Sequence, residues 1–284
     1  MIDLHVHTTH SDGRLSPTEA VQEATARGLC AIAITDHDVL SGLEEATSAG
    51  ERLGIEVVPG IEMSARWDGH RAIHVLGYFV DPTDAALNAA VERARRLMER
   101  HVTAVLREIR AAGGSLEAQD LDRYRHRYAG GAALVLGMLE RGVLKTSAPG
   151  TAMRLLRLAA AEPSAYSVQE AIALIHGAGG VASLAHPSRL KRGRPLLSAA
   201  ELEPLVRAGL DAIEAWQWVP NGWGSEHYRG LATDLGLSVS GGSDDHGKRA
   251  RDGSLRLGTQ QIPAEVLEAL RERALSKRQT PRSG

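Results

Sequence analysis

The chain has 284 residues, 43% of them hydrophobic, so it can bury a large core, either as one barrel with an insertion or as two domains. Its 33 basic and 35 acidic residues give a net charge of -2, which excludes the strongly basic surface typical of duplex-DNA-binding proteins. Aromatic residues make up only 4%, too few for platforms that stack long single strands, although a pocket for a nucleic-acid fragment needs only a few arginines.

Cysteine content and hydropathy narrow the class of protein further. The single cysteine, Cys30, lies in an apolar run, where we expect a small buried core residue. One cysteine excludes a disulfide framework and a thiolate zinc site. The first residues are typical of a strand rather than a signal peptide, and no apolar run reaches membrane-spanning length. We therefore expect a cytoplasmic protein with no membrane partner.

The first predicted strand carries Asp3-Leu4-His5-Val6-His7. Residues i and i+2 of a strand point to the same side, so His5 and His7 can reach one metal ion together. A histidine pair of this kind is not specific by itself, because two fixed residues often coincide by chance. It predicts a metal site only if further ligand-type residues converge on it.

Such residues recur along the chain, most of them at or just past the end of an apolar run. They are Asp12, Asp36, His37, Asp38, Glu62, His74, His186, Asp244, Asp245 and His246. In sheets and barrels built from strand-helix units, functional groups gather at the carboxyl ends of the strands. We therefore expect these side chains to meet at one rim.

Between these strands the sequence predicts helices. Ser16, Ser41, Ser167 and Ser198 are each followed three residues later by a glutamate, the spacing of a capping box, and glycines stand where the helices end. This alternation of strands and helices favours a parallel sheet or barrel.

Residues 83–164 break the alternation. One long helix is predicted over 83–112, followed by helical pieces with no strand signal. We predict a mainly helical insertion that serves as a lid or substrate domain. The barrel then comprises residues 1–82 and 165–277, and residues 278–284 are expected to form a disordered tail.

Taken in order, these motifs resemble those of the polymerase and histidinol phosphatase (PHP) superfamily of metal-dependent phosphoesterases. H-x-H, S-D-G, T-D-H-D, G-x-E, a strand histidine, A-H-P and S-D-x-H match over about the first eighty residues and again from Ser167 to His246. The resemblance implies an α/β fold, a distorted seven-stranded (β/α) barrel, with two to three divalent metal ions at its mouth. Manganese, iron and zinc are the usual metals of the family.

The resemblance also implies a role for each candidate residue. His5, His7 and Asp244 would bind the first metal, Glu62 would bridge to a second held by His74 and His186, and a third would be bound by Asp12, His37 and His246. Asp12, His37, Glu62 and Asp244 would thereby act in metal-assisted catalysis, while Asp36 and Asp38 would orient histidines. Glu214, at the end of another strand, is interpreted as a polar neighbour rather than a ligand, and His10 is close enough to stand beside the ligands.

Within the superfamily the chain is most similar to stand-alone members that remove phosphate from nucleotides such as 3',5'-bisphosphates or trim short RNA from its 5' end. It departs from them in the insertion, where Gly131-Ala132-Ala133 replaces an R-x-H motif. The basic cluster Arg123 to Arg127 could take over phosphate binding, or it could be an exposed face. Arg189, which stands where relatives also have arginine, and Arg14 are candidate substrate-binding residues, with a solvated surface charge as the alternative for each.

The chemistry of phosphate esters suits this set of residues. Clustered divalent cations neutralise phosphoryl charge and generate a metal-bound hydroxide, and mixed imidazole and carboxylate ligands fit manganese, iron or zinc. We expect a hydrolase of a small phosphorylated molecule, a nucleotide or a short RNA end, that does not bind duplex DNA. Two alternatives remain: hydrolysis of a C–N or lactone bond, and a non-catalytic metal-binding barrel. Nothing in the sequence predicts an oligomeric state.

Overall fold

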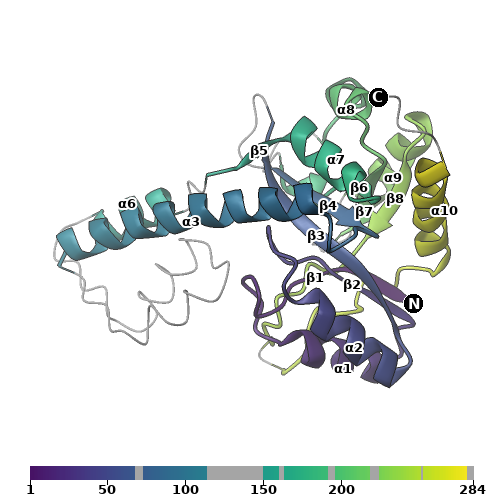
Figure 1. Ribbon diagram of the computed structural model, residues 1–284, viewed down its shortest axis with the longest axis horizontal. Coiled ribbons are helices and arrows are strands. Elements are labelled where there is room, and N and C mark those ends of the chain that lie inside the picture. Colours follow the sequence, from purple (N-terminus) through teal and green to yellow (C-terminus); the bar gives the residue numbers. More distant parts are fainter. Residues whose placement is uncertain are drawn as a thin grey trace.

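A curled sheet with helices packed around it makes up most of the computed structural model, and one long helix projects from it (Figure 1). The structure describes residues 1–67, 73–113, 150–159, 163–190, 196–217, 224–250 and 252–279. The predicted basic cluster at 123–127 and the Gly131-Ala132-Ala133 segment lie outside the described residues.

Within the described residues, seven strands follow one another across the sheet in the order β1-β2-β3-β4-β6-β7-β8, and an eighth, the two-residue strand β5, pairs with β3 beside this path. Seven is the strand number that the family resemblance implied. The strands are β1 (Ile2–Val6), β2 (Ala31–Ile34), β3 (Glu56–Arg66), β4 (Ile73–Tyr78), β5 (Tyr166–Ser167), β6 (Val181–Leu184), β7 (Ala212–Trp216) and β8 (Ser238–Gly241).

The sheet is not purely parallel, so the expectation of a parallel sheet is wrong at β4. This strand pairs antiparallel with both β3 and β6, whereas β1-β2-β3 and β6-β7-β8 are parallel. The reason is the short connection between Arg66 and Ile73, because a parallel pairing needs a crossover of a dozen or more residues. Strand β4 therefore starts, rather than ends, at the rim where the parallel strands finish; we call this rim the mouth.

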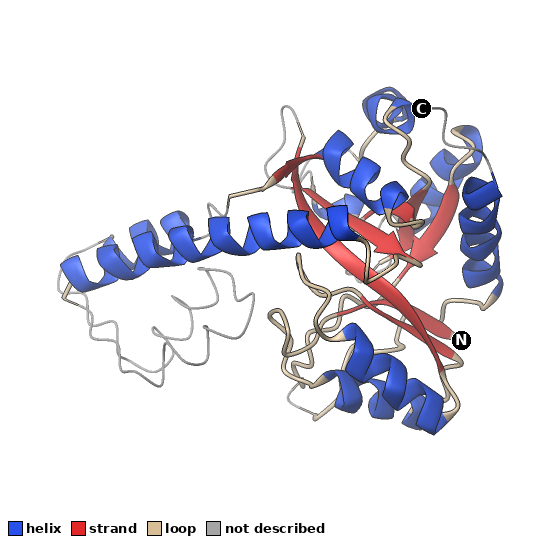
Figure 2. Cartoon of the chain, viewed as in Figure 1, coloured by secondary structure: helices blue, strands red, loops and turns tan. Residues whose placement is uncertain are grey.

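The two edges of the sheet approach each other at the mouth. Val6, the last residue of β1, forms a single parallel bridge with Asp245, just beyond β8. The His7 N–H donates to the Asp245 carbonyl at 2.9 Å. The sheet is thus a curled half-barrel (Figure 2), and its two edges meet at the Val6–Asp245 bridge.

Eight α-helices and one short 3-10 helix surround the sheet in the described part of the chain. They are α1 (Pro17–Ala26), α2 (Leu43–Leu53), α3 (Ala85–Ala111), α6 (Thr151–Ala159), α7 (Val168–Gly177), η1 (Pro187–Arg189), α8 (Ala199–Arg207), α9 (Ser225–Asp234) and α10 (Glu265–Gln279).

Three of the four predicted helix caps are present. Ser16 and Ser198 form capping boxes with their glutamates, and the Ser167 hydroxyl accepts the Glu170 N–H. The prediction at Ser41 is wrong, because α2 begins after Gly42 without a side-chain cap. The Ser41 hydroxyl lies instead 2.7 Å from Nδ1 of His10, so it is used by the loop after β1.

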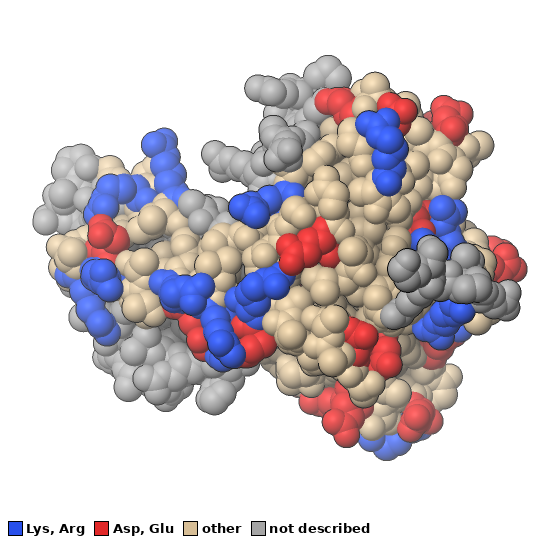
Figure 3. Space-filling view, turned by 45° about the horizontal axis from the view of Figure 1, so that its top comes forward, with Lys and Arg blue, Asp and Glu red and all other residues tan. Residues whose placement is uncertain are grey.

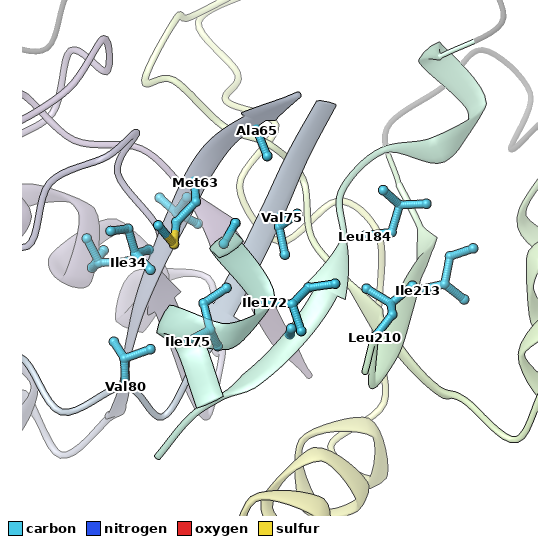
Figure 4. Close-up of a cluster of buried hydrophobic side chains, with 14 of the residues drawn as sticks. Ile34, Met63, Ala65, Val75, Val80, Ile172, Ile175, Leu184, Leu210 and Ile213 are labelled. Atoms are coloured by element: carbon cyan, nitrogen blue, oxygen red, sulfur yellow. The ribbon is translucent and has the colours of Figure 1, made fainter. Parts of the chain in front are cut away.

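Apolar side chains of the strands and helices interlock in the core. Figure 4 shows Met63 of β3 together with Ile172 and Ile175 of α7, all fully buried. A second cluster joins Ile2 and Leu4 of β1 with residues of α10. Each Å² of apolar surface buried in this way contributes about 25 cal/mol, and this burial stabilises the framework that fixes the strand ends.

The long helix predicted over 83–112 is α3, which begins at the Asp84 cap. The Tyr166 hydroxyl of β5 donates to the carbonyl of Ala90 at 3.1 Å. Since β5 pairs with the mouth end of β3, at Ala65 and Arg66, the helix beyond Ala90 extends past the mouth. We call this projecting part of α3, with α6 beside it, the arm (Figure 1).

Two further expectations are corrected. Cys30 is exposed rather than buried, because it precedes β2 at the surface and its thiol contacts the carbonyl of Met1. The tail does not start at 278: α10 continues to Gln279, and Arg278 donates to the carbonyls of Gly179 and Phe79. Residues 280–284 lie outside the described residues. No helix among those described has the length and apolar character needed to cross a membrane.

Candidate metal centre

All nine residues predicted as metal ligands meet at the mouth. Most lie near the end of a strand or in the loop that follows it, whereas Glu62 lies within β3 and His74 near the start of β4; together they draw on β1, β2, β3, β4, β6 and β8. They are His5, His7, Asp12, His37, Glu62, His74, His186, Asp244 and His246. The side chains fall into three overlapping groups.

The first group is fully buried and consists of His5, His7, Glu62 and Asp244. Nε2 of His5 lies 3.2 Å from Oε2 of Glu62, and Nε2 of His7 lies 3.1 Å from the same oxygen. Oδ1 of Asp244 lies 3.4 Å and 3.2 Å from these two nitrogens. The strand geometry expected for His5 and His7 therefore holds, since both rings present the same nitrogen to one point.

The second group forms around the other oxygen of Glu62. Oε1 lies 2.9 Å from Nδ1 of His74 and 3.0 Å from Nε2 of His186. In the antiparallel pairing of β3 with β4, Glu62 faces Leu76, so His74 is its diagonal neighbour on the same side of the sheet. Strand β4, which starts at the mouth, thus contributes a candidate ligand at its second residue.

The third group is more exposed and contains Asp12, His37 and His246, with His7 at its inner edge. Nε2 of His246 lies 3.2 Å from Oδ2 of Asp12, and Nε2 of His37 lies 4.0 Å from Oδ1. His37 also places Nδ1 3.1 Å from Oε2 of Glu62. His37 and His7 therefore connect this group to the buried ones.

The buried atoms at this centre fit metal ions. Among the described residues, Nε2 of His5, Nε2 of His7 and Oε2 of Glu62 have no hydrogen-bond partner, although all three are buried and aimed at one another. Unpartnered buried polar atoms are costly, and a cation between them would satisfy all three. The donor set of imidazole nitrogen and carboxylate oxygen suits zinc, iron or manganese.

The electrostatics of the centre also favour a cation. Burial raises the pKa of Glu62 and Asp244, but the surrounding histidines outweigh it and hold both well below their ordinary values. Burial lowers the pKa of His7, but the nearby carboxylates of Asp244 and Glu62 outweigh this effect and raise it to about 10. The pKa of His37 falls to about 3, chiefly through burial. The carboxylates thus stay ionised and attract positive charge.

The backbone is adapted to bring these groups together. A Cβ on Gly242 would lie 2.1 Å from Cβ of His5, so only glycine lets the end of β8 approach β1 so closely. His186 and Asp244 have φ of 30° and 52°, a conformation that costs free energy for residues with a side chain. Strain of this kind is concentrated at functional sites.

The two acidic residues beside His37 hold different loops in place. Asp36 accepts the Thr8 N–H at 2.7 Å and the Ser11 hydroxyl at 2.5 Å, so it fixes the loop after β1. The Ser11 hydroxyl lies 3.5 Å from Nδ1 of His7, so Asp36 reaches a histidine through Ser11 rather than directly. Asp38 accepts the Ser64 N–H at 3.0 Å and ties its loop to β3.

The two candidate substrate arginines differ in position. Arg189 ends η1, and its guanidinium contacts Oδ2 of Asp244. Arg14 donates its backbone N–H to the carbonyl of His246 at 3.0 Å, while its side chain is exposed. Only Arg189 is thus placed by its side chain against the first group.

Sequence reasoning underestimated Glu214. This residue is fully buried in β7, and its carboxylate contacts both Nδ1 of His5 and the backbone N–H of His186. The available signal was a lone acidic residue within the apolar strand Ala212–Trp216, since unpaired acids are rarely buried.

Comparisons with known proteins identify relatives of this chain. A family model described as a PHP domain matches residues 3–178. A 3',5'-nucleoside bisphosphate phosphatase from Chromobacterium violaceum is 34% identical over 277 residues, covering 88% of this chain and 90% of that protein. A 5'-3' exoribonuclease from Haemophilus influenzae is 35% identical over 201 residues, covering 66% of this chain and 69% of that protein.

A solved structure shows the same architecture. The crystal structure of a protein from Bifidobacterium adolescentis, assigned as a metal-dependent phosphoesterase, is 27% identical to this chain. The two superimpose with a TM-score of 0.78 over 96% of each chain. The similarity therefore includes the full length of the molecule and not only its metal-binding motifs.

Proposed function

This chain belongs to the PHP domain family, a family of metal-dependent phosphoesterases, and on that premise we propose that it removes phosphate from nucleotides, with nucleoside 3',5'-bisphosphates as the first substrates to test. The observation that carries the proposal is the position of Glu62, which presents one oxygen to His5 and His7 and the other to His74 and His186. A carboxylate placed in this way can hold two cations side by side. The alternatives of C–N or lactone hydrolysis and of a non-catalytic barrel are not favoured, because the relatives are phosphoesterases.

We propose the following ligand sets. His5, His7 and Asp244 would bind one metal, with Glu62 shared; His74 and His186 would bind the second; and Asp12, His37 and His246 would bind the third. Bound divalent metals would lower the pKa of a water molecule toward about 7 and neutralise charge on the phosphoryl oxygens. Manganese, iron and zinc are the candidates on donor chemistry.

The protein's own residues prepare the site for this chemistry. The first group is buried, whereas 27% of the Asp12 side chain in the third group is exposed, so a phosphate ester would approach from the side of the third group. Arg189 is placed to bind a phosphoryl oxygen, since its guanidinium already lies against Asp244 and planar bidentate contacts suit phosphate. We keep Arg14 as a candidate for a second phosphate at the rim.

Charge distribution supports an anionic substrate. We propose that residues 83–164 are the lid or substrate domain of a barrel formed by residues 1–82 and 165–277. This insertion contains 13 basic and 9 acidic side chains. The rest of the chain contains 20 basic and 26 acidic side chains. Figure 3 shows arginines gathered along the arm, which extends past the mouth. Such segregation attracts anions toward one side of a protein.

Phosphate release tests the proposal. The purified protein, supplied with Mn²⁺, would be assayed on nucleoside 3',5'-bisphosphates, mononucleotides, short 5'-phosphorylated RNA and sugar phosphates. The proposal predicts the highest kcat/KM on a bisphosphate or on the RNA end. Equal or better hydrolysis of sugar phosphates would refute the nucleotide assignment while leaving the phosphoesterase intact.

A further inference from the structure

Glu214 links two elements of the centre that are far apart in sequence. It lies in the middle of β7 and is fully buried. Oε1 lies 2.9 Å from Nδ1 of His5 on β1, and Oε2 accepts the backbone N–H of His186, just after β6, at 2.5 Å. Each oxygen of this single carboxylate thus serves a different candidate ligand.

The contact with His5 determines which ring nitrogen faces the first group. A carboxylate oxygen that accepts a hydrogen bond from Nδ1 keeps a proton on that nitrogen. When His5 binds a metal, Nε2 is then the nitrogen with the lone pair, and it faces Oε2 of Glu62 and Oδ1 of Asp244. A histidine ligand must present such a lone pair to a metal.

The contact with His186 determines the position of a strained turn. His186 has a φ of 30°, and it is followed by η1, which ends at Arg189. Gln217, just after β7, accepts the Ser188 N–H at 3.2 Å and donates to the carbonyl of Glu214 at 3.2 Å. The end of β7 therefore holds the turn by two successive backbone contacts, which direct Nε2 of His186 to Glu62.

We propose that Glu214 is a positioning residue that orients His5 and His186 together, and so couples metal binding at the two groups that share Glu62. The inference rests on the proposed function, because it requires that these groups bind metal. It adds a residue that neither the motifs nor the ligand sets include. Glu214 itself stays outside the coordination shell and acts only through the two histidines.

Glutamine at position 214 cannot keep both contacts, the one to the His5 ring and the one to the His186 N–H. A carboxylate offers two acceptor oxygens, whereas an amide offers one oxygen and an NH₂ that can only donate. In Glu214→Gln either the His186 N–H loses its acceptor or the His5 ring is forced into the tautomer that places a proton on Nε2. Glu214→Asp keeps both acceptors on a shorter side chain and should restore part of the function.

Asp211 provides a matched control. It is also buried, it pairs with a histidine, His176, at 2.7 Å, and it accepts a backbone N–H, that of Ala182, at 3.0 Å. It lies at the amino ends of β6 and β7, away from the mouth. Asp211→Asn therefore removes the same kind of contact without touching a candidate ligand.

The experiment is a titration of metal-free protein with Mn²⁺ by calorimetry, with circular dichroism to check folding. We expect Glu214→Gln to weaken Mn²⁺ binding at the two Glu62-sharing groups about 10- to 100-fold and to leave the Asp12, His37 and His246 group unchanged. Glu214→Asp should lie between the two proteins, and Asp211→Asn should bind like the wild type. A second readout needs no metal: the His5 Nδ1–H resonance in the NMR spectrum of the metal-free wild type should shift or disappear in Glu214→Gln, because the ring N–H then bonds to a neutral amide oxygen or loses its acceptor.

These measurements distinguish a failure of the Glu214 proposal from a failure of the proposed function. Unchanged Mn²⁺ affinity and an unchanged His5 resonance in Glu214→Gln would overturn this inference alone, provided that the wild type binds Mn²⁺ and releases phosphate. Equal weakening in Asp211→Asn would also overturn it, because the effect would then be general destabilisation. Absence of Mn²⁺ binding by the wild type would instead overturn the proposed function.

Discussion

Glu62 presents Oε1 at 2.9 Å from Nδ1 of His74, while its other oxygen faces the histidines of β1. One side chain on β3 therefore joins β4 to β1, which lie on opposite sides of β3 in the strand order. Replacing it with glutamine removes the negative charge and leaves a single acceptor oxygen.

We predict that Glu62→Gln lowers phosphate release in Mn²⁺ by at least about 100-fold and lowers the bound metal content, since a shared ligand is lost. Phosphate assays and elemental analysis of the dialysed protein measure the two effects, and circular dichroism checks the fold. Full activity with a reduced metal content would argue against a catalytic role for the metals.

Arg189 should act on substrate binding more than on turnover. Hydrogen bonds to charged groups contribute about 1.5–3 kcal/mol, so Arg189→Gln should raise KM for a nucleotide by about ten- to a hundredfold. Arg207→Gln on α8, where the wild-type arginine is exposed and paired with Glu203, serves as the neutral control. A fall in kcat with no change in KM would assign Arg189 to Asp244 rather than to the substrate.

Gly242 should be intolerant of any side chain. Gly242→Ala would place a Cβ 2.1 Å from that of His5, so β8 must move away and the first group must open. We expect a loss of about 1–3 kcal/mol in the free energy of unfolding, together with weaker metal binding. Gly230→Ala in α9 is the control. A Cβ at this position would meet no other part of the protein within 4 Å, so the substitution should be neutral or stabilising. Comparable losses in both variants would contradict this reading of Gly242.

Asp211 should stabilise the fold in a pH-dependent way. Burial raises its pKa, but hydrogen bonds from His176 and Lys277 outweigh this and lower it. A carboxyl with a depressed pKa stabilises the folded state above its unfolded pKa of about 3.9, and this contribution is lost as pH falls through the folded pKa. Denaturation at pH 7 should therefore show Asp211→Asn to be less stable by about 1–3 kcal/mol, a difference that narrows below about pH 4. A constant difference down to pH 2 would rule out the ionised form as its source.

The candidate ligands could be predicted from sequence because strand ends converge in any sheet of this kind. His5 and His7 needed only the two-residue period of a strand, and His37 and His186 needed only the apolar runs before them. Glu214 was undervalued because its importance depends on which strands are neighbours. A single sequence does not show that β7 lies beside β6, or that the carboxylate reaches across to β1.

The antiparallel direction of β4 illustrates the same limit. His74 was identified as a ligand from its residue type, yet the apolar pattern around it is the same for either strand direction. Only the short connection after Arg66 carried the directional information. The exposure of Cys30 was likewise hidden, because an apolar neighbourhood in sequence does not reveal that a residue precedes its strand at the surface.

Anomalous X-ray diffraction from crystals grown with Mn²⁺ would locate the metals at the mouth. We expect at least two anomalous peaks within coordinating distance of the two oxygens of Glu62, with His5 and His7 on one and His74 and His186 on the other. A map without a peak near Glu62, from protein that releases phosphate in the same Mn²⁺ solution, would contradict this expectation.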